Sequence, residues 1–149
     1  MAEQTPLSEL VAAGSIRLAE HASSRDDAIR LVGATLVESG AVDDSYVAAM
    51  LEREASVSTY VGEGIAFPHA TLAGKDAVHH DGLVVVRFPD GVDWDGHDVR
   101  VCVGIAARGR GHIRLLSRLA TLLLSPGVAD ALHEASSDDA VRALLVERG

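Results

Sequence analysis

The first half of the chain carries apolar residues at helical spacing in two segments. Residues 24–40 predict a helix, with Ser24 as its N-cap, Asp27 three positions later as in a capping box, and Gly40 at its end. Residues 43–54 predict a second helix, whose apolar face is separated from a charged face by Val47, Met50, Leu51 and Glu54. Each of these helices is expected to bury one side.

The pattern changes to that of strands at residue 58. Residues 81–93 contain a continuous β-branched run. In residues 98–109, valine or isoleucine occupies every second position from Val99 to Ile105. Together with residues 58–69, they predict three successive strands, which are expected to be neighbours with antiparallel pairing available through the connecting loops. Residues 14–20 predict one more brief strand nearer the start of the chain.

Helical spacing returns over residues 112–124. Ser125 and Pro126 fit the N-cap and first position of a further helix, and Ser136 is expected to open the last one, which runs to Arg148. The order is therefore strand, two helices, three strands, three helices. Helices on both sides of a small mixed β-sheet would bury the apolar faces, so the predicted fold is a three-layer α/β/α sandwich with its site at loop ends along one sheet edge.

Length and composition limit what such a fold can do. With 149 residues and 48% hydrophobic content, the chain is expected to form a single domain over residues 1–149. Thirteen Lys and Arg against 22 Asp and Glu give a net charge of −9, which repels a phosphate backbone. No nucleic-acid partner is therefore expected.

The sequence also indicates a cytoplasmic protein. One cysteine cannot form an internal disulfide, and the N-terminus lacks the pattern of a secretory signal. The longest uncharged stretch, Leu119 to Ala129, contains Pro126 and falls short of the ~20 apolar residues that span a bilayer.

One histidine follows a proline at the end of a predicted strand, in the stretch GIAFPHATLAGKD. Pro68 fixes its own φ and keeps Phe67 out of the helical region, so the chain reaches His69 along a stiffened, extended path. Such a path lowers the entropic cost of presenting one ring nitrogen. On spacing alone, however, an ordinary loop histidine is the favoured interpretation, because a Pro-His pair is common in loops.

A second histidine follows the glycine-rich turn in ARGRGHIRLLSRL. His112 falls at or next to the first turn of the following helix, where free N–H groups and the helix dipole favour an anion. The alternative is a flexible basic turn that only connects strand to helix.

Arg53 lies late in the second predicted helix, just before the strand that leads to His69. An arginine fork suits phosphate oxygens, although an exposed helix arginine usually pairs with a neighbour such as Glu52 or Glu54, or with water. A histidine, a histidine at a helix start and an arginine are together the groups needed to receive and hold a phosphoryl group.

Other reactive residues have simpler interpretations. None of the seven histidines forms an HExxH motif and the single Cys102 cannot complete a zinc ribbon, so neither a metal nor another cofactor is expected. A histidine-based metal site, with the His79-His80 pair as a misleading candidate, stays a third hypothesis. Cys102 lies inside an alternating strand and is expected to be a small core residue.

Three runs, LEREASVSTYVGEGIAFPHAT, DGLVVVRFPDGV and VGIAARGRGHIRLLSRLA, resemble the type-2 IIA component of the sugar phosphotransferase system (PTS EIIA type-2, the mannitol/fructose family). The resemblance covers about residues 8 to 148 and is nearest to the mannitol branch. The run Gly109-Arg110-Gly111 departs from the polar residues common there, which leaves the charge around His112 and the preferred partner open.

The resemblance implies a phosphotransferase. His69 would accept a phosphoryl group on Nε2 from the phosphocarrier protein HPr and pass it to a cysteine of a IIB domain, with Arg53 near the phosphate and His112 as the supporting histidine. IIB and the IIC permease are expected on separate polypeptides, and no direct contact with sugar is expected. The alternative from another class is a regulatory protein similar to the nitrogen-branch IIA proteins. The sequence leaves the sugar and the oligomeric state open.

Overall fold

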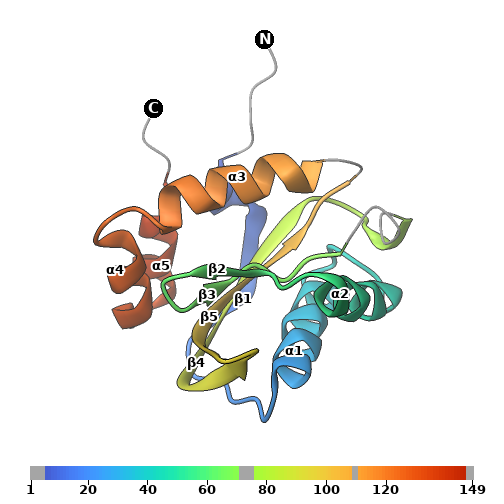
Figure 1. The fold of residues 1–149 in the computed structure, drawn as a ribbon. Helices are drawn as coiled ribbons and strands as arrows, with labels where there is room; N and C mark the ends of the chain where they lie inside the picture. Colours follow the sequence, from blue (N-terminus) through green and yellow to red (C-terminus); the bar gives the residue numbers. More distant parts are fainter. Residues whose placement is uncertain (1–5, 71–75, 109–110, 147–149) are drawn as a thin grey trace.

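The computed structural model describes residues 6–70, 76–108 and 111–146, without the side chains of Gly111 and His112. After a short 3-10 helix, Leu7–Leu10, the elements are β1 (Val11–Arg17), α1 (Arg25–Glu38), α2 (Ser45–Ser56), β2 (Tyr60–Gly62), β3 (Ile65–Ala66), β4 (Gly82–Trp94), β5 (His97–Ala106), α3 (Gly111–Leu123), α4 (Val128–Glu134) and α5 (Asp138–Leu144). Figure 1 shows them in one view.

The strands form one mixed sheet in the order β1-β4-β5-β3-β2. β4 and β5 pair antiparallel, whereas β1 lies parallel to β4 and β3 lies parallel to β5. Because β3 and β5 run the same way, the loops that follow both strands leave the sheet at the same edge. The predicted site edge is therefore the one where β3 and β5 end.

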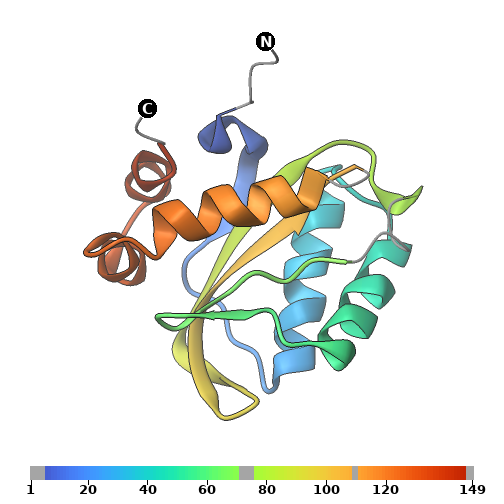
Figure 2. The ribbon, with the colours of Figure 1, turned by 45° about the horizontal axis from the view of Figure 1, so that its top comes forward.

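Helices cover both faces of the sheet, as predicted for a three-layer α/β/α sandwich (Figure 2). Along β4, the even-numbered residues pack with α1 and α2, and the odd-numbered ones pack with the 3-10 helix and α3 to α5. Val84, for example, shares a core cluster with Val32 of α1, and Leu83 shares the opposite cluster with Leu119 of α3. This alternation follows from the period of two in a strand.

The helices approach the sheet closely because a glycine lies at the contact. A β-carbon placed on Gly104 of β5 would lie 2.4 Å from Val32 Cγ1 of α1 and 2.8 Å from Val84 Cγ2 of β4. A β-carbon on Gly33 of α1 would lie 2.8 Å from Val47 Cγ2 of α2. All three distances are shorter than ordinary side-chain contacts, so glycine is needed at these two positions to pack α1 against both α2 and the sheet.

The strand expected over residues 58–69 is instead a hairpin. Glu63 has φ 56° and Gly64 has φ 72°, which turns the chain between β2 and β3. Glycine adopts positive φ at little cost, and the segment GEG supplies it on both sides of Glu63. The prediction of antiparallel neighbours was correct for β4 and β5 but wrong for β3, which lies parallel to β5.

The predicted start and end of α1 are confirmed. Ser24 Oγ accepts a hydrogen bond from Asp27 N at 3.2 Å, and Gly40 follows the helix with φ 86°. β1, by contrast, begins at Val11 rather than at residue 14, because the parallel register joins Val11 to Leu83 of β4.

Both C-terminal helix starts differ from prediction. Ser125 continues from α3, since its Oγ donates to Thr121 O at 2.6 Å, and Gly127 with φ 83° is the N-cap of α4. Ser137, not Ser136, caps α5 by accepting from Ala140 N at 3.1 Å. The predicted helix end at Arg148 was wrong, because α5 ends at Leu144 with Leu145 as its C-cap.

Within the described ranges, no single helix is long and apolar enough to cross a membrane. Ile113–Leu123 and Val128–Glu134 reach that length and composition only as a pair bent by 89°.

Candidate functional site

His69 lies just beyond β3, at the edge of the sheet where β5 also ends, and it is 4% exposed. Its Nδ1 is 2.7 Å from the carbonyl oxygen of Phe67. Because a carbonyl oxygen only accepts hydrogen bonds, Nδ1 carries the proton in the neutral ring and the lone pair is on Nε2. The fold thus selects the tautomer that a nucleophilic Nε2 requires.

The backbone on the near side of His69 is held from two directions. Phe67 N donates to Thr59 O at 3.0 Å, and Ile105 N of β5 donates to Pro68 O at 3.0 Å. The stiff, extended approach that Pro68 predicts is therefore present, and hydrogen bonds to both neighbouring segments fix it in place. A ring held by its own strand loses little freedom when it reacts.

Arg53 lies in the last turn of α2 and is partly buried. Its Nη1 donates to Val57 O at 2.6 Å, and Val57 N donates to Arg53 O at 3.1 Å. Thr59, two residues after Val57, pairs with Phe67, two residues before His69, through the hydrogen bond from Phe67 N to Thr59 O. The guanidinium is thus bound at the start of the segment whose Thr59 pairs with the strand end that leads to His69.

Glu54, the neighbour of Arg53, is 3% exposed and fixes this end of α2. Its Oε2 accepts from Thr59 N at 2.8 Å and from Trp94 Nε1 at 3.0 Å, and its Oε1 accepts from Thr59 Oγ1 at 2.5 Å. The sequence placed Glu54 at the border between the apolar and the charged face of the helix. That prediction was wrong: the carboxylate is buried, because Thr59 and Trp94 provide hydrogen-bond partners inside the core. The sequence signal was the spacing of Tyr46, Met50 and Glu54, which lie on one helical line and are all buried.

His112 is the second residue of α3, so its predicted place in the first turn of a helix is confirmed for the backbone. Its side chain, together with Gly109 and Arg110, lies outside what the structure describes. The chain reaches α3 directly from the end of β5, and the start of this connection is held by a hydrogen bond from Arg108 N to Asp81 Oδ1 at 3.0 Å. His69 and His112 therefore follow two parallel neighbouring strands at the same edge.

Cys102 is a core residue, as predicted. It is fully buried and faces Ala66 of β3, and burial together with the charge of Glu54 raises the pKa of its thiol far above the ordinary value. His79 and His80 are exposed. Among the described residues, no group of three or more His, Cys, Asp or Glu side chains is placed to hold a metal ion.

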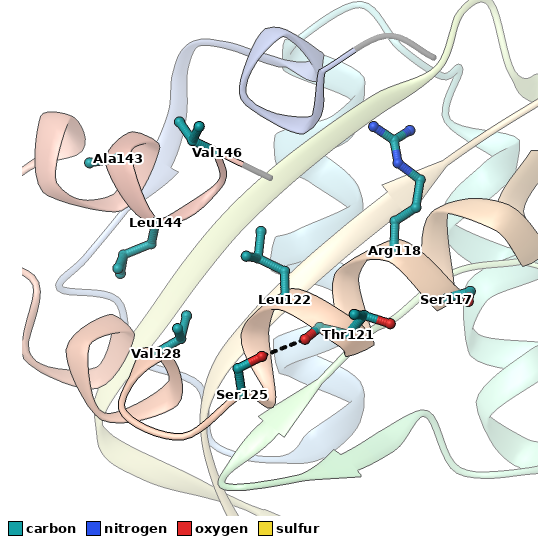
Figure 3. A pocket seen from close by; sticks show the side chains of 9 residues that line it. All are labelled: Ser117, Arg118, Thr121, Leu122, Ser125, Val128, Ala143, Leu144 and Val146. Atoms are coloured by element: carbon teal, nitrogen blue, oxygen red, sulfur yellow. Dashed lines mark hydrogen bonds between the residues drawn. The ribbon is translucent and has the colours of Figure 1, made fainter. Parts of the chain in front are cut away.

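A separate cavity of about 530 Å³ lies between α3, α4 and α5 (Figure 3). Its lining is mainly apolar on the α5 side, through Leu144 and Val146, and more polar along α3, through Ser117, Arg118 and Thr121. Neither His69 nor Arg53 lines it.

The arrangement at the β3 and β5 ends suits the transfer of an anionic group. It combines a buried imidazole with its lone pair on Nε2, a guanidinium on the adjacent chain segment and the N-terminal turn of α3, where unpaired N–H groups attract negative charge. An imidazole nucleophile beside such donors can take up a phosphoryl group and stabilise its oxygens.

Comparison with known proteins gives consistent results. The family model described as phosphoenolpyruvate-dependent sugar phosphotransferase system, EIIA 2, matches residues 9–148. The mannitol-specific phosphotransferase enzyme IIA component of Staphylococcus aureus (strain MRSA252) is 41% identical over 141 residues, which are 95% of this chain and 98% of that protein.

Two solved structures are similar over most of the chain. The crystal structure of IIA mannitol from Escherichia coli has a TM-score of 0.84 at 38% identity and covers 91% of this chain and 99% of that one. The complex of IIA mannitol with phosphorylated IIB mannitol, also from Escherichia coli, has the same TM-score and identity and covers 91% and 96%.

Proposed function

The chain belongs to the EIIA 2 family of the phosphoenolpyruvate-dependent sugar phosphotransferase system, and on that premise we propose that His69 is its phosphoryl-carrying residue. The observation that carries this proposal is the 2.7 Å hydrogen bond from Nδ1 to the Phe67 carbonyl oxygen. It reserves Nε2 as the nucleophile, and no other described histidine combines such burial with a fixed ring orientation at this edge of the sheet.

The transfer proceeds by attack of the Nε2 lone pair on the phosphorus of the donor. The new N–P bond forms as the donor's bond to phosphorus breaks, and that bond's electron pair leaves with the donor. The proton stays on Nδ1, hydrogen bonded to Phe67 O, and this bond stabilises the positive charge that develops on the ring. The reverse step, attack by an acceptor on the same phosphorus, returns the electron pair to Nε2.

Arg53 and the start of α3 at His112 act on the phosphoryl oxygens. In a loose, in-line transition state, negative charge is spread over the equatorial oxygens. A guanidinium fork and helix N–H groups aimed at that charge stabilise the transition state more than the ground state. For this to occur, the Arg53 guanidinium exchanges its bond with Val57 O for bonds to phosphate.

The donor and acceptor are proteins in this proposal. HPr supplies the phosphoryl group in the cytoplasm, and a cysteine of a IIB component receives it, in keeping with the similarity to the Escherichia coli IIA that is seen bound to phosphorylated IIB. The mannitol-specific relatives support mannitol, or a related polyol, as the transported sugar. The sugar itself makes no contact with this chain and is selected by the IIC permease.

Labelled phosphoenolpyruvate tests the proposal. The full chain is incubated with enzyme I and HPr, and then with a IIB component. We expect an acid-labile, alkali-stable label that is absent in His69→Ala and that moves to the IIB cysteine. Label that reaches this chain but never IIB indicates a regulatory role instead, and label retained by His69→Ala contradicts the assignment of the residue.

A further inference from the structure

The hydroxyl group of Tyr46 joins the two chain segments that meet at His69. It donates a hydrogen bond to Ile105 O at 2.7 Å and accepts one from Ala70 N at 3.1 Å. Tyr46 is 3% exposed, and burial raises the pKa of its phenol above the ordinary value. The hydroxyl therefore keeps its proton and can serve both partners at once.

These two partners are the ones that an ordinary parallel ladder would join directly. β3 pairs with β5 through Ala66 and Cys102, and this register, continued by three residues, places His69 opposite Ile105. In a parallel ladder, a residue donates to one neighbour of its partner and accepts from the other. Ile105 N indeed donates to Pro68 O at 3.0 Å, but Ile105 O accepts from Tyr46 in place of Ala70 N.

Tyr46 is thus inserted into the ladder at the position of His69. The phenol oxygen lies between Ala70 N and Ile105 O, so the chain after His69 stands away from β5 by the width of a hydroxyl group. The residue before His69 remains in direct contact with β5 through Pro68 O. The backbone therefore turns away from the sheet at the histidine, and Tyr46 sets how far.

The same helix carries the arginine of the site. Tyr46 and Arg53 are seven residues apart in α2, which is close to two helical turns, so both lie on one side of the helix about 10 Å apart along its axis. Any movement of α2 would shift the anchor of His69 and the guanidinium together. Glu54 fixes the far end of this helix to Thr59 and Trp94.

Residues just before α2 also bind the chain at Ala77 and Val78, which follow His69 in the sequence. Asp43 N donates to Ala77 O at 2.9 Å, and Val42 forms an antiparallel bridge with Val78. Ala70 is therefore attached to Tyr46, and Ala77 and Val78 are attached to the residues immediately before α2.

We propose that Tyr46 is a positioning residue for phosphoryl transfer, acting by holding the His69 backbone at a fixed separation from β5 through its inserted hydroxyl group. The inference rests on the proposed role of His69. Without the hydroxyl, Ala70 N and Ile105 O lose their common partner and the histidine is free to shift toward or away from β5. A misplacement of about 1 Å is enough to slow a reaction about a hundredfold.

Tyr46→Phe in the full chain tests the proposal, with Tyr60→Phe as the matched control. The chain contains two tyrosines, and among the described residues the Tyr60 hydroxyl has only a 3.5 Å contact with Gly64 N. With phosphorylated HPr as donor, we expect Tyr46→Phe to lower the single-turnover rate about tenfold to a hundredfold while the affinity for HPr and the final amount of label stay unchanged. Tyr60→Phe is expected to transfer at the normal rate.

A second measurement retains the hydroxyl and so avoids dependence on the stability of Tyr46→Phe. In the Tyr60→Phe background, 3-fluorotyrosine labels position 46 alone, and its fluorine resonance is expected to shift when His69 is phosphorylated. A normal transfer rate in folded Tyr46→Phe overturns the inference. So does a fluorine resonance that does not shift when His69 is phosphorylated. Failure of the proposed function gives a different result, a wild-type chain that takes up no label.

Discussion

The ring of His69 is hydrogen bonded to the backbone of Phe67, two residues earlier in the same chain, through a contact of 2.7 Å between Nδ1 and the carbonyl oxygen. This contact decides which nitrogen is protonated in the neutral ring. We therefore expect nitrogen-15 NMR of the unphosphorylated protein to find His69 as the Nδ1–H tautomer. Phosphorylation is expected to move the Nε2 resonance and leave Nδ1 protonated; a phosphoryl group on Nδ1 would contradict the predicted geometry.

Replacement of Arg53 tests the role of the guanidinium. Arg53→Ala is expected to slow phosphoryl transfer about a hundredfold, because the transition-state oxygens lose a charged donor. The loss of its bond to Val57 O is expected to cost only about 1 kcal/mol of unfolding free energy. Arg53→Lys keeps the positive charge but loses the forked guanidinium, so its transfer rate is expected to lie between those of the wild type and Arg53→Ala.

The control for Arg53 is Arg30→Ala, which removes the same charge from the exposed side of α1, where Arg30 pairs with Asp27 at 2.9 Å. Its transfer rate is expected to be normal, as measured by rapid quench with labelled HPr. Equal slowing in both variants would mean that only the overall charge matters, not the position of Arg53.

Much of the fold followed from the residue pattern, since helical and period-two segments are local signals. Ser24 and Gly40 were correctly placed at the ends of α1 because capping and positive φ depend on neighbouring residues. The hairpin between β2 and β3 was missed because its strands are only three and two residues long. So short a pair is stable only through its contact with β5, which is distant in the sequence.

In the candidate site, too, only the residues with a local sequence signal could be predicted. Pro68 and His69 could be singled out because a proline restricts its neighbours locally. Helical spacing could place Tyr46 and Glu54 on one buried line, but it could not reveal their roles, because these depend on Ile105 and Trp94, which are 59 and 40 residues away in the sequence. The backbone of His112 is where the helix signal placed it.

Gly104 tests the close packing of α1 on the sheet. Gly104→Ala would place a methyl group 2.4 Å from Val32 Cγ1, so it is expected to lower the unfolding free energy by about 1–3 kcal/mol. Denaturant titration measures this loss. Val32→Ala makes room at the same point, so the double variant is expected to lose less than the sum of the two single losses; strict additivity would show that the two residues do not compete for space.

Cys102 predicts how stability depends on alkaline pH. Burial raises the pKa of its thiol in the folded chain above the ordinary value of 9.0, so the folded state keeps the proton when the unfolded state releases it. Stability is then fully present below pH ~9 and is lost as pH rises, by about 1.4 kcal/mol per pH unit for this group. Urea titrations of the wild type and Cys102→Ala between about pH 8 and about pH 10.5, which bracket the ordinary pKa of a thiol, measure this loss. The stability difference between the two proteins is expected to stay constant below about pH 8.5 and to change above it; parallel curves throughout would contradict the prediction.

The proposed function requires that one phosphoryl group resides on His69. Intact-protein mass spectrometry at neutral pH, after incubation with phosphoenolpyruvate, enzyme I and HPr, tests it directly in the wild type, in His69→Gln and in His133→Gln as the control. We expect the mass of a single phosphoryl group on the wild type and on His133→Gln, and none on His69→Gln. A phosphorylated His69→Gln, or a wild type that stays unmodified while HPr is phosphorylated, would contradict it.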